Sequence, residues 1–148
     1  MRPYSYLMSS TGGEGAHYVE LLESKFLELL RELLVRVEVD EPWYLQTYRD
    51  VQDAVHSGLV KSARAHYIGA GYFENRMPRP IQVDEAWYVL EYPDVAEAIR
   101  AGAFPSAAHH FERDGFREGR LAHQGWSLLG GDRPRSANQQ FMAQQSYA

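Results

Sequence analysis

The chain has 148 residues, of which 45% are hydrophobic and 13% aromatic. It is therefore long enough for one ordinary domain or two very small ones, and too apolar to be disordered throughout. The net charge of -5, without a basic run, argues against nucleic-acid binding through phosphate contacts, and the absence of cysteine excludes disulfides and cysteine metal sites.

The two ends of the chain are predicted to be flexible. Residues 1–15 are rich in Ser and Gly, and residues 127–148 are polar and Gln-rich. The amino terminus lacks an apolar stretch of signal-peptide length, and no run approaches the roughly 18 apolar residues of a membrane span. These features predict a cytoplasmic protein without membrane insertion.

Residues 16–38 predict one long amphipathic helix, because they are dense in strong helix formers and contain neither Gly nor Pro. The apolar side chains cover about half of the helix circumference, whereas a surface helix needs a stripe of about 100°. One edge, at Leu27, Leu30 and Leu34, is predicted to pack on the rest of the chain. On the polar face, Glu32 and Arg36 have the spacing of a helical ion pair.

The remaining apolar surface of this helix predicts self-association. Four of its residues have the 4-3-4 spacing of a coiled-coil seam. Pairing with the same helix of a second chain, most simply as a dimer, would cover them. The predicted interface comprises Val19, Leu22, Phe26, Leu29 and Leu33.

Residues 39–82 and 83–126 carry related sequences at an offset of 44 residues, and a period of this size is typical of helical repeats. The identical pairs include Asp40/Asp84, Trp43/Trp87, Tyr44/Tyr88, Tyr48/Tyr92, Asp50/Asp94, His66/His110, Gly71/Gly115, Glu74/Glu118 and Arg76/Arg120.

Each copy is predicted to form three short helices. In the first copy, Asp40 is expected to cap the first helix, Asp50 to lie near the start of the second and Ser62 to cap the third. Gly58 and Gly71 are expected to end the second and third helices in the left-handed conformation. The equivalent residues 44 positions later have the same predicted roles.

The aromatic and branched residues of the repeats predict a shared core, and the closing turn of each copy predicts an ion pair or cap, at Glu74 and Arg76 in the first copy. The predicted repeat core comprises Trp43, Tyr48, Val51, His66, Trp87, Tyr92, Val95 and His110.

The residues do not predict a catalytic, cofactor or metal site. His109 and His110 are adjacent, so on a helix they point about 100° apart and are poorly placed to hold one ion. "AGAFPS" and "RDGFREGR" lack phosphate-loop spacing, and "DGFREGR" lacks the alternating ligands of a calcium loop. No arrangement of nucleophile and base is evident. We therefore expect a protein that is not an enzyme.

The phrases "EAWYVLEYPDVAEAIRAG", "SAAHHF" and "DGFREGR" resemble a short bacterial helical repeat of the form YY…YPDVA…G…A…HY…G…EGR. Repeats of that family occur beside glycosyltransferase domains and in repetitive surface proteins of proteobacteria. The first copy departs from the pattern at Arg49, where the pattern has Pro, and at Asn75, where it has Gly. The resemblance implies a helical accessory module, linked to polysaccharide or cell-surface production.

The sequence thus predicts an all-α protein, with one long amphipathic helix followed by two tandem three-helix repeats. The leading functional hypothesis is a bacterial assembly or scaffold protein that self-associates through the helix and docks another bacterial protein through the repeats. The alternative is a carbohydrate-associated module, in which the aromatic pairs Trp43–Tyr44 and Trp87–Tyr88 stack on sugar rings.

Overall fold

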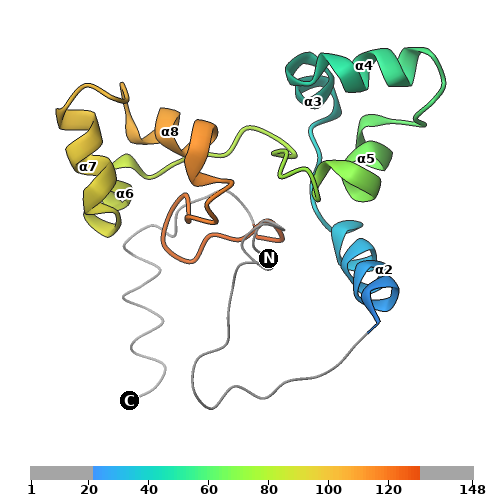
Figure 1. Cartoon of the computed structure of the whole chain (residues 1–148), viewed down its shortest axis with the longest axis horizontal. Helices are drawn as coiled ribbons and strands as arrows, with labels where there is room; N and C mark the ends of the chain where they lie inside the picture. Colours follow the sequence, from blue (N-terminus) through green and yellow to red (C-terminus); the bar gives the residue numbers. More distant parts are fainter. Residues whose placement is uncertain (1–21, 131–148) are drawn as a thin grey trace. The chain divides into compact units, whose positions relative to one another are not determined.

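The computed structural model describes residues 22–130. Val19, the predicted flexible segment 1–15 and most of the predicted tail lie outside these residues. Within them the chain forms seven α-helices and two π-helical turns and contains no strand, so the all-α prediction is confirmed for this part (Figure 1). None of the described helices is long and apolar enough to cross a membrane.

The described chain divides into two compact units. Unit 1 contains the residues up to Pro80 together with Arg117–Gly119, and unit 2 contains Ile81–Phe116 and the residues from Arg120 onward. The elements of unit 1 are α2 (Glu23–Leu34), α3 (Glu41–Thr47), α4 (Arg49–His56), α5 (Ala63–His66) and the π-helical turn η1 (Tyr67–Gly71). The elements of unit 2 are α6 (Glu85–Glu91), α7 (Pro93–Arg100), α8 (Ala107–His110) and the π-helical turn η2 (Phe111–Gly115).

Side-chain caps start the first and third helices of unit 1, as predicted. The Asp40 carboxylate accepts a hydrogen bond from the backbone N–H of Trp43 at 3.0 Å, and the Ser62 hydroxyl accepts one from Ala65 at 3.1 Å. In unit 2 the equivalent acceptors are Asp84, from Trp87 at 3.0 Å, and Ser106, from His109 at 3.1 Å. Local sequence therefore fixes where these helices begin.

Left-handed backbone follows the second helix of each unit. Gly58 has a φ of 76° and Gly102 a φ of 77°, which confirms the predicted helix ends. A second left-handed position follows η1 at Asn75, with a φ of 56°, and recurs at Gly119, with a φ of 73°. Asn tolerates this conformation better than most residues. The departure from Gly at Asn75 therefore preserves the backbone shape.

The core of unit 1 is built from tyrosines and aliphatic side chains. Tyr44, Val51, Tyr67 and Tyr72 are each at most 1% exposed. The ring of Tyr67 packs edge-on against that of Tyr44, with 6.1 Å between centroids, and against that of Tyr72, with 6.4 Å. In unit 2 the corresponding buried residues are Tyr88, Val95, Phe111 and Phe116, which are joined by Trp126.

Helix α2 is shorter than predicted at its carboxyl end, because it stops at Leu34 rather than at Glu38. Arg64, at the start of α5, gives the physical reason. Its guanidinium donates hydrogen bonds to the carbonyl oxygens of Val35 and Val37, the second at 3.1 Å. A side chain thus satisfies carbonyls that a further helical turn would have used.

Two predicted features of α2 have different outcomes. Leu30 and Leu34 are buried in unit 1, as expected for the inner edge of the helix, and Leu27 is half-buried. The predicted ion pair between Glu32 and Arg36 does not form, because Arg36 lies beyond the end of the helix. Lys25 and Glu28 form an exposed ion pair at 2.8 Å instead.

Candidate functional site

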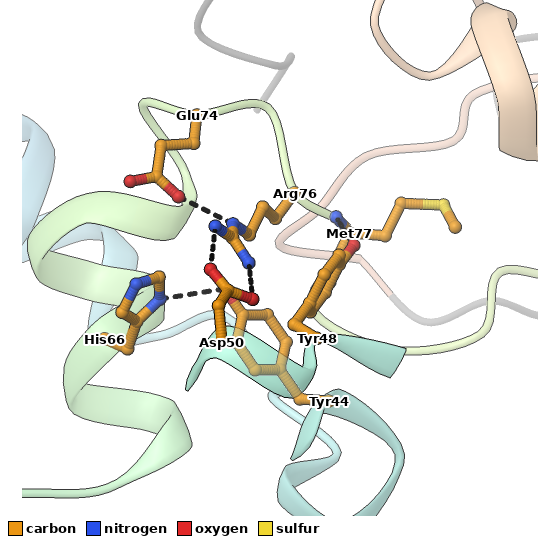
Figure 2. A network of polar contacts seen from close by, with 7 residues as sticks. All are labelled: Tyr44, Tyr48, Asp50, His66, Glu74, Arg76 and Met77. Carbon is orange, nitrogen blue, oxygen red and sulfur yellow. Dashed lines mark hydrogen bonds and ion pairs between the residues drawn. The ribbon is translucent and has the colours of Figure 1, made fainter. Parts of the chain in front are cut away.

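The most developed polar cluster of unit 1 is the clasp, which we define as Tyr48, Asp50, Glu74, Arg76 and Met77 (Figure 2). The Arg76 guanidinium donates two hydrogen bonds to the Asp50 carboxylate, at 2.9 and 2.6 Å, and one to Glu74 at 2.6 Å. It also lies over the ring of Tyr48, 4.9 Å from the centroid. One cation thus ties the start of α4 to the turn after η1.

The hydroxyl of Tyr48 completes the clasp. It accepts a hydrogen bond from the backbone N–H of Met77 at 2.9 Å, which fixes the segment that leaves the closing turn (Figure 2). Burial raises the pKa of Tyr48, so the phenol is neutral near pH 7. The predicted ion pair of Glu74 and Arg76 is confirmed, whereas the larger contribution of Asp50, 26 residues earlier, was not predicted.

A second polar pair lies beside the clasp. The Tyr44 hydroxyl is 3.2 Å from Nδ1 of His66, which joins α3 to α5 (Figure 2). Burial raises the pKa of Tyr44 and lowers that of His66, so both groups are neutral near pH 7. We therefore assign the phenol as donor and Nδ1 as acceptor, with the imidazole proton on Nε2.

Gly71 lies against this pair, and its backbone conformation differs from the predicted one. It was expected to end its helix in the left-handed conformation, but its φ is not positive. A Cβ atom at Gly71 would lie 2.1 Å from the Tyr44 hydroxyl oxygen and 3.2 Å from Nδ1 of His66. The glycine is required by the close approach of the tyrosine. The same holds for Gly115, where a Cβ atom would lie 2.3 Å from the Tyr88 hydroxyl oxygen.

The arginine–aspartate, cation–π and tyrosine contacts recur in unit 2, 44 residues later. Arg120 donates to the Asp94 carboxylate at 3.0 and 2.7 Å and lies over the Tyr92 ring at 4.8 Å. The Tyr92 hydroxyl accepts from the backbone N–H of Leu121 at 2.8 Å. The hydroxyl of Tyr88 and Nδ1 of His110 are 3.1 Å apart. An arrangement that occurs twice, with the same partners, is typical of a structural device.

The electrostatics of the clasp indicate stabilisation rather than acid–base chemistry. Hydrogen bonds from Arg76 lower the pKa of Asp50 to about 2, and those from Arg120 lower the pKa of Asp94. Hydrogen bonding to Asp50 raises the pKa of Arg76. These shifts favour the charged forms, which Asp and Arg side chains already adopt near neutral pH. A proton-transfer catalyst needs a pKa near the working pH.

The predicted core residues are buried to different degrees. Val51 and Val95 are 1% exposed and His110 is 5% exposed, so these three belong to the core. The half-buried members of the predicted set are Trp43, Tyr48, His66, Trp87 and Tyr92. Tyr44 and Tyr88, which were predicted only as the neighbours of the tryptophans, are the fully buried members of each aromatic pair.

The predicted self-association residues that fall within the described chain lie on α2 or directly before it. Leu22 is 73% exposed, Leu29 is 53% exposed and Leu33 is 41% exposed, while Phe26 is half-buried. Large apolar side chains with such exposure at helical spacing form a surface that proteins commonly cover. We call Leu22, Phe26, Leu29 and Leu33 the α2 seam.

The described residues also bear on metal binding. They contain no group of three or more His, Asp or Glu side chains placed to hold a metal ion. In comparisons with protein-family models, with curated proteins and with solved structures, the chain gives no match.

Proposed function

We propose that the protein is a non-enzymatic assembly or scaffold protein. In this proposal the chain self-associates through the helix predicted over residues 16–38, and its repeats dock another bacterial protein. One observation carries the proposal. The apolar residues of α2 divide between two faces, because Leu30 and Leu34 are buried in unit 1 while Leu29 and Leu33 are exposed.

The second face of α2 has the geometry of a helix–helix interface. At 3.6 residues per turn, the four side chains of the α2 seam form one stripe along the helix. Burial of a leucine side chain is worth about 1.5–3 kcal/mol. A second copy of α2 offers a stripe of the same shape and polarity, so symmetric pairing covers both at once.

The two units support the proposal of tandem three-helix repeats. Both contain the same caps, the same arginine–aspartate ion pair and the same tyrosine–histidine pair at an offset of 44 residues. Repeat modules of this kind commonly serve as binding surfaces, because each copy offers a similar face. We assign partner docking to the repeats on this ground, and the link to polysaccharide or cell-surface production on the resemblance alone.

The carbohydrate alternative relies on four aromatic side chains, and the structure exposes fewer of their rings than this alternative requires. Tyr44 and Tyr88 are 0% exposed and engaged with histidines, so neither ring face is open to a sugar. Trp43 and Trp87 are half-buried, and each packs edge-on against a tyrosine, with centroids 6.1 and 6.0 Å apart. Only part of each indole is therefore left for stacking.

Two aspartate substitutions test the proposed interface. The variant carrying Leu29→Asp and Leu33→Asp is expected to be monomeric in sedimentation velocity, at concentrations where the unmodified chain is dimeric. Charges in the middle of an apolar seam are costly to bury. Leu59→Asp is the matched control, since Leu59 is 83% exposed and lies outside α2.

The folding of these variants is checked by circular dichroism, and helical content is expected to be unchanged because the substituted side chains are exposed. A dimer that persists in the Leu29 and Leu33 variant would contradict the proposed interface. Loss of the dimer in the Leu59 variant would show that the charge acts elsewhere than at the α2 seam.

A further inference from the structure

The charges beside the α2 seam carry information on the direction of pairing. In coiled-coil notation, Phe26 and Leu33 occupy a positions, and Leu22 and Leu29 occupy d positions. Side chains at e and g flank such a seam and set the orientation of the partner. On α2 the e position next to Phe26 is Leu30, which is 5% exposed and already buried in unit 1.

The opposite flank is charged and open. Its g positions are Lys25 and Glu32, seven residues apart and of opposite sign. The Lys25 side chain is 63% exposed, and Glu32 is exposed and forms no ion pair with any described residue. Because the two are separated by about 10 Å along the helix, they are too distant to pair with each other in one chain.

A parallel pair of α2 helices would give these two charges no partner of opposite sign in the second copy. In that arrangement a g residue faces the e residue five positions later in the other chain. Lys25 would face Leu30, and Glu32 would face Val37, yet both of these side chains are buried in unit 1. A parallel pair therefore gains no ion pair from Lys25 or Glu32.

In an antiparallel pair, the same charged residues face partners of opposite sign in the second copy. There an a residue faces a d residue, so Phe26 lies opposite Leu29 of the second copy and Leu22 lies opposite Leu33. One register satisfies both contacts, and it places Lys25 opposite Glu32 of the second copy. Because the arrangement is symmetric, this ion pair forms twice.

We propose that α2 pairs in antiparallel fashion with α2 of a second copy, with two reciprocal Lys25–Glu32 ion pairs on the open flank of the seam. This inference rests on the proposed self-association, and adds to it the direction and the register of the pairing.

Charge reversal tests the ion pairs. Lys25→Glu and Glu32→Lys each place two like-charged pairs across the interface, and each is expected to raise the dimer dissociation constant about tenfold at low salt. The double variant restores opposite charges only in the antiparallel arrangement. It is expected to return within about threefold of the unmodified chain, and the differences should shrink in 1 M salt.

The double variant also controls for the ion pair within one chain. Lys25→Glu breaks the contact between Lys25 and Glu28 in the single and the double variant alike. Recovery of dimerisation in the double variant therefore reports on the contact between chains. A double variant as weak as the singles, or three variants as strong as the unmodified chain, would overturn the antiparallel register.

Disulfide trapping gives a second measurement, because the chain has no cysteine of its own. We mix a tagged Leu22→Cys chain with an untagged Leu33→Cys chain and oxidise them. The antiparallel register predicts the mixed disulfide. Within each variant alone, the cysteines would lie about 16 Å apart along the axis, beyond the reach of a disulfide.

The outcomes separate the two proposals. A monomeric unmodified chain would end both the self-association and this inference. A dimer that gives homodisulfides of the Leu22→Cys chain, with no mixed product, would retain self-association and overturn the antiparallel direction. A dimer with the mixed product and the restored double variant supports both.

Discussion

Gly71 offers the sharpest test of the packing around the tyrosine–histidine pair. In Gly71→Ala the added methyl group would lie 2.1 Å from the Tyr44 hydroxyl oxygen, whereas an ordinary contact begins near 3.4 Å. Tyr44 is 0% exposed and packs against Tyr48, with 4.6 Å between centroids, so its ring is poorly placed to move away. We expect a loss of about 1–3 kcal/mol in the free energy of unfolding, the usual cost of overpacking.

A matched glycine isolates the cause of this loss. Gly69 lies in the same π-helical turn, but a Cβ atom there meets nothing within 4 Å. Gly69→Ala is therefore expected to be neutral or to stabilise by up to about 1 kcal/mol, because alanine restricts the unfolded chain. Equilibrium unfolding in urea measures both variants, and a Gly71→Ala chain as stable as the Gly69→Ala chain would refute the reasoning.

Removal of the tyrosine hydroxyl completes the test. Tyr44→Phe alone is expected to cost about 1 kcal/mol, because His66 loses a buried hydrogen-bond partner. In the double variant with Gly71→Ala, the nearest remaining contacts are 3.2 Å to Nδ1 of His66 and 3.4 Å to Cζ of residue 44. The combined loss should therefore fall short of the sum by about 1–2 kcal/mol. Strictly additive losses would show that the hydroxyl and the methyl group do not collide.

Three further predictions concern the clasp, a turn and the tryptophans. Asp50→Asn is expected to cost about 1 kcal/mol or less at pH 7, since the Asp50 side chain is 63% exposed. The folded pKa of about 2 lies below the ordinary 3.8, so this stabilisation is present above pH 3.8 and is lost as the pH falls through 2. The urea midpoints of Asp50→Asn and of the unmodified chain should therefore converge as the pH falls, and a constant difference would contradict the pairing with Arg76. Gly58→Ala should lower the free energy of unfolding by about 1 kcal/mol, because the residue has a positive φ, while the added Cβ atom would meet nothing within 4 Å. An unchanged thermal midpoint would refute this. Titration with oligosaccharides to millimolar concentration should leave tryptophan fluorescence unchanged, whereas quenching or a spectral shift would favour sugar binding at Trp43 and Trp87.

Features encoded by neighbouring residues were predictable from the sequence. The caps at Asp40 and Ser62 depend on hydrogen bonds that span three residues, and the left-handed turn at Gly58 depends on one residue. The outward face of α2 at Leu29 and Leu33 follows from helical periodicity. In each case the relevant interaction is local, so the pattern of residue types determines it.

Features that depend on distant contacts were not predictable in the same way. Trp43 and Tyr44 are adjacent, and on a helix they point about 100° apart. Which of them is buried depends on the position of α5, and the structure buries Tyr44. The end of α2 likewise depends on Arg64, about 30 residues after the helix end, and the role of Gly71 depends on Tyr44 from another helix.

Self-association through the α2 seam is the central claim, and sedimentation equilibrium of the unmodified chain tests it most directly. The seam leaves three leucines at least 41% exposed, and we propose that a second copy covers them. The account predicts an average mass that rises with concentration toward 34 kDa, twice the 17.0 kDa of one chain. A mass that stays at that of one chain at high micromolar concentration would contradict it.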